Sequence, residues 1–144
     1  MSLNDFIFEP GAWIGEGKIT FSASPEFIKF YTRWQIEKIN DKIFQATQVV
    51  EMVGIPEKLN NTLTITDIKP HSFSLILQNN TVSQIHGKGI RDDKTIAWEF
   101  RGQEDFEGFE VYEKQENGDY FMHAEYGAPE QYRTMVEGLI WRKA

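Results

Sequence analysis

Glu137 is a carboxylate inside an extended run in which Leu139 and Trp141 share its parity. A carboxylate on an apolar face is costly unless it is paired or hydrogen-bonded. On such a face Glu137 could bind the polar end of a ligand, pair with an arginine, or act as an acid or base with a raised pKa. The alternatives are that Glu137 sits at the rim of the fold, or that the run buries Val136 and Ile140 and leaves Glu137 in water.

Gln48 is a second polar residue on an otherwise apolar face, because it shares parity with Ala46 and Val50. Aromatic walls that carry a few polar groups are typical of small-molecule sites. The same aromatic residues could instead fill a core, and both interpretations stay open at this point. The ligand-binding residues that we predict are Trp34, Gln48, Trp98, Tyr120, Met122, Tyr126, Glu137 and Trp141.

The sequence gives little support for a metal site or for nucleophilic catalysis. His71, His86 and His123 lie far apart and show no H-x-H or H-E-x-x-H spacing, so we expect no metal site. The sequence has no cysteine, which excludes disulfides, thiol catalysis and cysteine-bound zinc. It also lacks a G-x-S-x-G motif. The glycines at 15–17 lack the full G-x-G-x-x-G and a following helix, so they indicate a tightly coiled strand rather than a phosphate-binding loop.

Ten short extended runs must position these side chains. Turn residues separate the runs, and Asn117-Gly118 is the strongest hairpin signal among them. The two Asn-Asn-Thr segments, at 60–62 and 79–81, also indicate turns. No long helical period is present, so the chain is predicted to be all-β. The runs cover residues 12–22, 27–38, 42–53, 59–68, 71–78, 81–91, 95–101, 106–115, 119–126 and 132–142.

Strands in this order, joined by short turns, predict an antiparallel meander, and closure into a barrel removes its edges. About eight strands just fill a barrel with side chains, so about ten could leave a cavity for a ligand. A two-sheet sandwich is the alternative, although it usually has longer crossovers. We expect a single domain over residues 1–144, with Phe6, Ile7 and Phe8 plugging one end.

Gly11-Ala12-Trp13, at the start of the first run, resembles the G-x-W motif of the lipocalins and the wider calycin superfamily. The longer stretch 11–17 is similar to the start of nitrobindin-type ten-stranded barrels. The resemblance implies an up-and-down, calycin-like β-barrel in which a basic residue from the last strand covers the tryptophan ring. Arg142, or else Lys143, would take that role on Trp13.

Charge and composition limit the partners. The formal net charge is −7, from 15 basic and 22 acidic residues, and no basic run is present, so nucleic acid is not expected as a partner. The first residues show neither a basic region nor a long apolar stretch, so we expect no signal peptide. The apolar runs are too short to span a bilayer as a helix. We therefore expect a cytoplasmic protein.

The sequence is compatible with four functions. The first is a protein that binds a small, largely apolar or aromatic ligand inside the barrel. The second is a small-molecule acid/base enzyme that uses Glu137 with Tyr112, Tyr120 or Tyr126. The third is a haem protein, because nitrobindins carry a haem-ligating histidine late in the chain; this sequence departs from that pattern, since no histidine follows His123. The fourth is an interaction module, such as a homodimer formed through a barrel face.

Overall fold

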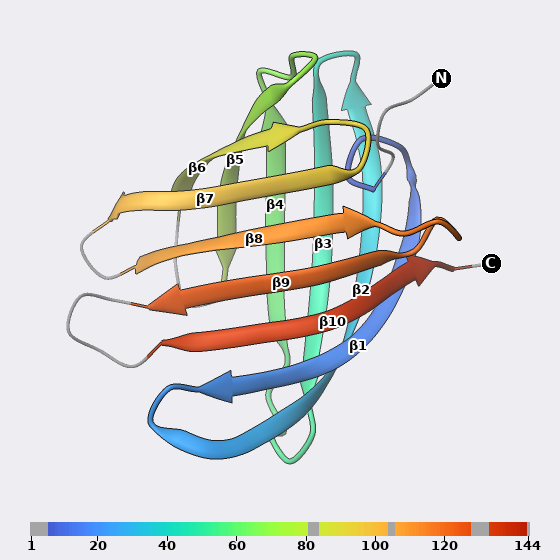
Figure 1. Ribbon diagram of the computed structural model, residues 1–144. Coiled ribbons are helices and arrows are strands. Elements are labelled where there is room, and N and C mark those ends of the chain that lie inside the picture. Colours follow the sequence, from blue (N-terminus) through green and yellow to red (C-terminus); the bar gives the residue numbers. More distant parts are fainter. Residues whose placement is uncertain (1–5, 81–83, 104–105, 128–132, 144) are drawn as a thin grey trace.

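The computed structural model describes residues 6–80, 84–103, 106–127 and 133–143, and every regular element among them is a β-strand. Each of the ten predicted runs overlaps one strand, so the all-β prediction is confirmed (Figure 1). In this part of the chain no helix is long and apolar enough to cross a membrane. The strands are β1 (Gly11–Phe21), β2 (Ser24–Asn40), β3 (Ile43–Met52), β4 (Leu59–Thr66), β5 (Ser72–Asn79), β6 (Ile85–Arg91), β7 (Thr95–Gln103), β8 (Phe106–Lys114), β9 (Tyr120–Gly127) and β10 (Thr134–Arg142).

The ten strands form a closed barrel in which each strand pairs with its neighbours in sequence and the first strand pairs with the last. All these pairings are antiparallel. The β1–β10 ladder runs from the pair Trp13–Arg142 to the pair Phe21–Thr134. Closure gives each of the described strands a partner on both sides. The predicted up-and-down barrel is therefore confirmed, and the sandwich alternative is wrong.

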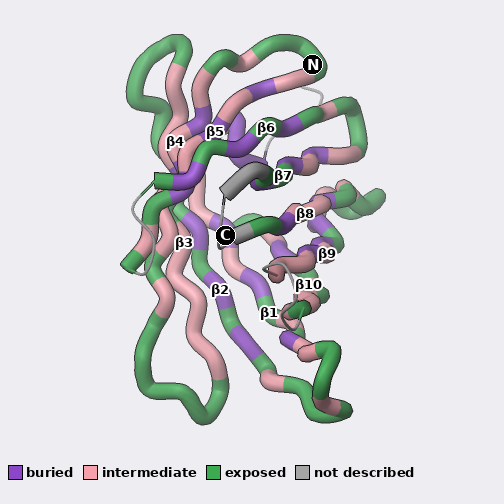
Figure 2. The backbone as a smooth tube through the Cα atoms, turned by 90° about the vertical axis from the view of Figure 1, so that its left-hand side faces the viewer, coloured by how far each residue is buried: buried purple, intermediate pink, exposed green. Residues whose placement is uncertain are grey.

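Alternation of buried and less buried residues, clearest along β2, β5 and β6, divides the residues between the barrel interior and the solvent (Figure 2). In β2, Thr32 and Trp34 are buried. Tyr31, just before Thr32, and Arg33, between the two, are exposed. This follows from the two-residue period of a strand, which sends successive side chains to opposite faces.

Two glycines permit the close approach of β1 and β10. Gly17 and Gly138 are Cα partners across this ladder. A Cβ on Gly17 would lie 2.0 Å from the carbonyl oxygen of Glu137, and a Cβ on Gly138 would lie 2.5 Å from that of Glu16. Only glycine leaves room for these backbones, as expected where strands bend sharply.

Residues 6–8 close one end of the barrel, as predicted. Phe6, Ile7 and Phe8 are buried, and the Phe6 ring meets the Trp13 ring edge to face at a centroid distance of 5.4 Å. The Arg142 guanidinium lies over the Trp13 ring, 4.9 Å from its centroid. The cation–π contact that the resemblance implied is therefore present, and Arg142 makes it.

Large aromatic side chains fill this half of the interior. Phe6 packs on Trp34 at 5.1 Å, and Trp98 stacks on Tyr112 at 5.1 Å with an interplanar angle of 26°. Because these rings pack against one another, they leave little space among themselves in this half of the interior. We call this cluster the aromatic plug; it consists of Phe6, Trp13, Trp34, Trp98, Tyr112 and Tyr120.

Candidate functional site

A cavity of about 280 Å³ occupies the half of the barrel away from the aromatic plug. Its apolar lining comes from aliphatic, methionine and phenylalanine side chains of several strands, and its polar lining comes from a few separate groups. The residues around it are Ile19, Phe21, Phe30, Gln48, Val50, Met52, Leu59, Asn61, Leu63, Leu77, Asn79, Glu110, Met122, Tyr126, Thr134 and Val136.

One wall carries a row of side chains joined by hydrogen bonds, which we call the amide ladder: Thr32, Gln48, Asn61 and Asn79. Asn79 Nδ2 donates to Asn61 Oδ1 at 3.1 Å, and Asn61 Nδ2 donates to Gln48 Oε1 at 2.9 Å. Gln48 Nε2 then donates to Thr32 Oγ1 at 2.9 Å. The ladder arises because Gln48, Asn61 and Asn79 are successive cross-strand partners on β3, β4 and β5.

A carboxyl group stands on the opposite wall. Glu110 lies on β8 at the same parity as Tyr112, and both side chains turn inward. The Tyr112 hydroxyl donates a hydrogen bond to Glu110 Oε1 at 2.6 Å, and the Tyr126 hydroxyl donates one to Glu110 Oε2. Glu110 and Tyr126 line the cavity, whereas Tyr112 belongs to the aromatic plug. Glu110 thus joins the cavity to the plug.

Burial sets the protonation of this group. Burial raises the pKa of Glu110, and the hydrogen bonds from Tyr112 and Tyr126 lower that pKa part of the way back. The indole N–H of Trp98 also lowers the pKa of Glu110. This N–H makes no hydrogen bond of regular geometry within the described part of the chain. The pKa values of Tyr112 and Tyr126 lie well above the ordinary value, because of burial first and the charge of Glu110 second. Both tyrosines therefore stay protonated as donors.

Three of the predicted ligand-binding residues line the cavity: Gln48, Met122 and Tyr126. Three others, Trp34, Trp98 and Tyr120, lie inside the barrel but are buried in the aromatic plug. The ring contacts of these three residues are part of the core, which was the alternative interpretation of the sequence.

Glu137 and Trp141 lie on the outer face of β10, so the expectation that they face the interior is wrong. The Glu137 side chain is 54% exposed. The physical reason is the β1–β10 ladder, which places Gly138 inside against Gly17 and so sends the opposite parity outward. Ile140 is buried on the inner face of the same strand.

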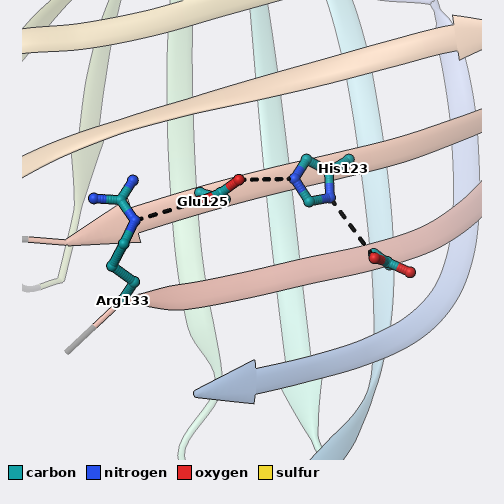
Figure 3. Close-up of polar contacts among 4 residues, drawn as sticks. His123, Glu125 and Arg133 are labelled. Atoms are coloured by element: carbon teal, nitrogen blue, oxygen red, sulfur yellow. Dashed lines mark hydrogen bonds and ion pairs between the residues drawn. The ribbon is translucent and has the colours of Figure 1, made fainter. Parts of the chain in front are cut away.

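A polar cluster of His123, Glu125 and Arg133 lies on the outer surface of the barrel (Figure 3). Glu137 contacts this cluster through His123. His123 Nε2 lies 3.1 Å from Glu125 Oε2, and Arg133 Nε lies 3.3 Å from Glu125 Oε1. Glu137 Oε1 is 3.9 Å from His123 Nδ1. The hydrogen bond with His123, and then the contacts of Arg133, lower the pKa of Glu125. This cluster has no access to the cavity, so Glu137 and the tyrosines do not converge.

The three histidines of the chain all lie in described segments, and none of them lines the cavity. His71 and His86 are exposed, and His123 is half-buried in the outer cluster. The described residues also contain no group of three or more histidine, aspartate or glutamate side chains that could hold a metal ion. A haem iron inside the barrel would therefore lack a histidine ligand from the cavity wall.

Sequence reasoning missed Glu110, Asn61 and Asn79. Glu110 shares parity with Tyr112, a candidate cavity tyrosine, but the pattern does not single it out, because Phe109 and Val111 make the other face of that run apolar as well. The segment 60–62 lies within β4, so the prediction of a turn there is wrong. Asn79 is the last residue of β5, and the end of the second Asn-Asn-Thr segment lies outside the described residues. The available signal was that Asn61 lies in an extended run at the same parity as Leu63, which places both side chains on one face.

Two solved structures share this fold. The crystal structure of Rv2717c from M. tuberculosis matches with a TM-score of 0.72 and 11% sequence identity, over 94% of this chain and 92% of that chain. The S-type phycobiliprotein lyase CPES from Guillardia theta matches with a TM-score of 0.71 and 9% identity, over 94% of this chain and 88% of that chain. No protein-family model and no curated protein matches the sequence. At these identities the likeness concerns the fold alone: a closed, ten-stranded, calycin-like barrel.

Proposed function

We propose that this protein binds a small, largely apolar ligand in the cavity, and that polar groups on two opposite walls hold the ligand's polar atoms. The observation that carries the proposal is a cavity of about 280 Å³ whose lining is mostly apolar but includes Gln48, Asn61 and Glu110. Binding sites for small molecules usually combine an apolar surface with a few placed polar groups. The size of the cavity favours a ligand of one or two rings.

The amide ladder would bind a carbonyl or hydroxyl oxygen of the ligand. Each terminal NH₂ of Gln48 and Asn61 uses one of its two hydrogens within the ladder. The second hydrogen of each is uncommitted among the described residues and belongs to a side chain that lines the cavity. The ladder also fixes the rotamers of these side chains, so that little entropy is lost when a ligand binds.

A direct test uses the neutral, polarity-sensitive dye prodan and a variant that fills the cavity. Leu77 lines the cavity, and we expect Leu77→Trp to weaken prodan binding about tenfold or more by occupying its volume. Leu139→Trp, at a 45% exposed position on the outer face of β10, should leave binding unchanged. Fluorescence titration measures both. Equal binding by the two variants, with both folded by circular dichroism, would contradict a ligand site in the cavity.

A second candidate function is proton transfer, because Glu110 and Tyr126 meet inside one cavity. An ionised Glu110 would take a proton from the carbon next to a substrate carbonyl. The electron pair would move to the carbonyl oxygen, which the N–H groups of Gln48 and Asn61 would stabilise, and the proton would then return to carbon. Nuclear magnetic resonance of 1-tetralone in D₂O tests this. Exchange at that carbon should be faster with the protein than with its Glu110→Gln variant, and equal rates would exclude it.

The fold also supports membership of the calycin superfamily. The support is the ten-stranded closure together with the Arg142 guanidinium over Trp13, which matches the arrangement that the resemblance implied. A histidine-ligated haem has no such support, since the cavity wall offers no histidine among the described residues.

A further inference from the structure

The cavity has an uneven charge. Glu110 is the one carboxyl among its lining residues in the described segments, and no lysine, arginine or histidine lines it there. Two tyrosine hydroxyls donate hydrogen bonds to Glu110, and the indole N–H of Trp98 also favours its ionised form. None of these groups carries a positive charge. The carboxyl group therefore has no cationic partner in the described part of the chain.

A buried carboxylate without a cation is in an unfavourable state. Hydrogen bonds from Tyr112 and Tyr126 compensate for lost water only in part, as the raised pKa of Glu110 indicates. A positive group brought in by a ligand would supply the missing charge, in a setting of low dielectric where the attraction is stronger than in water. A second carboxylate would be repelled by the first.

From this geometry we infer the ligand class: a protonated amine on an apolar body of one or two rings, with its nitrogen donating hydrogen bonds to Glu110. This inference rests on the proposed function, since it names the ligand of the same cavity. The amide ladder on the opposite wall offers only neutral dipoles, so it does not reverse the preference for positive charge. The net charge of the whole chain, −7, also attracts cations to the molecule.

The acceptor geometry of Glu110 suits an ammonium group. Each carboxylate oxygen accepts one tyrosine hydroxyl, and each has a further lone pair. An ammonium group has three donors and no acceptor, so it can use the remaining lone pair on the cavity side while the tyrosines keep their bonds. Where Glu110 is protonated before binding, its proton leaves to solvent as the ion pair forms.

Three probes that share one skeleton test this inference: 1-naphthylmethylamine, 1-naphthylmethanol and 1-naphthoic acid. By isothermal titration calorimetry near neutral pH, we expect the amine to bind about tenfold or more tightly than the alcohol, and the acid to bind most weakly. In Glu110→Gln the amine should lose about tenfold in affinity while the alcohol changes little. Glu137→Gln removes a carboxylate from the outer face and should leave all three affinities as they are.

The possible outcomes separate the two proposals. If the alcohol binds but the amine is no tighter, or if the acid matches the amine, the inferred ligand class is wrong and the proposed function stands. If Glu110→Gln keeps the amine preference, the inferred ligand class is likewise wrong. If none of the probes and no prodan binds, both proposals fail. Should Glu110→Gln not fold, the comparison of the three probes on the native protein still decides the matter.

Discussion

Gln48 on β3 and Glu110 on β8 face each other across the barrel interior, because their strands are five apart around a closed ring of ten. One is a neutral amide tied into a ladder, and the other is a carboxyl held by two tyrosines. A ligand between them would meet polar groups at two ends and apolar walls elsewhere. The pair therefore defines the direction in which a ligand would lie.

The difference in unfolding free energy between Glu110→Gln and the native chain should shift in favour of the variant as the pH rises. Burial raises the folded-state pKa of Glu110, so the folded chain binds more protons than the unfolded chain between the ordinary and the raised pKa. Native stability contributed by this group therefore falls as pH rises through that interval. Glu110→Gln keeps the shape of the side chain but cannot ionise. The variant's free energy of unfolding, relative to that of the native chain, should therefore increase over the same pH interval by on the order of 1 kcal/mol. Urea unfolding at several pH values measures this, and a gap that narrows toward higher pH would contradict it.

The amide ladder should depend on its central member. Asn61→Ala removes the partner of both Gln48 and Asn79, and we expect a loss of about 1–3 kcal/mol in the free energy of unfolding. Its neighbour Asn60 is exposed on β4, so Asn60→Ala should cost less than about 0.5 kcal/mol. Chemical denaturation of the two variants gives the comparison. Similar losses would show that the ladder contributes nothing beyond strand propensity.

The seam between β1 and β10 should not tolerate a side chain at Gly17. Gly17→Ala would place a methyl group 2.0 Å from the Glu137 carbonyl oxygen, so the two strands must separate. We expect a loss of about 3 kcal/mol or more in unfolding free energy. Glu16→Ala, on the exposed face of the same strand, is the control and should change stability little. A thermal unfolding midpoint for Gly17→Ala that equals the control would refute this account of the seam.

The contact of Arg142 with Trp13 should contribute to closing the plugged end. Arg142→Ala removes a guanidinium that lies 4.9 Å from the ring centroid, and we expect a loss of about 1 kcal/mol. Lys143→Ala, at the next and exposed position, should be close to neutral. Tryptophan fluorescence during denaturation follows both variants, and an equal shift in the two would show that Trp13 does not depend on Arg142.

The strands and the plug could be predicted because they depend on local patterns. Alternation marks each strand, and Gly11-Ala12-Trp13 pointed to Arg142. The inner face of β10 could not be chosen this way, since Val136 and Ile140 are as apolar as Leu139. Its direction is set by a partner strand more than a hundred residues away, through Gly17 and Gly138.

The same limit explains the missed carboxyl. Phe109 and Val111 lie on one face of β8, and Tyr112 lies on the other together with Glu110, so the sequence does not decide between the two faces. The pairing of β8 with β7 and β9 decides it. Alternation predicts which face a side chain lies on, but it does not predict how far along the barrel axis that side chain lies. Trp98 and Met122 both point inward, yet one fills the plug and the other lines the cavity. Which half of a barrel is hollow depends on how large side chains from distant strands meet.

The pairing of β1 with β10 has a consequence for folding kinetics. Residues at opposite ends of the chain, such as Trp13 and Arg142, must find each other before the ring is complete. Such a non-local pairing costs loop-closure entropy before any contact compensates for it, so the last ladder should form late and folding should be slow. Until then β1 and β10 each present an unpaired edge to other chains. Newly made protein is therefore most exposed to aggregation in the interval before its first and last strands join.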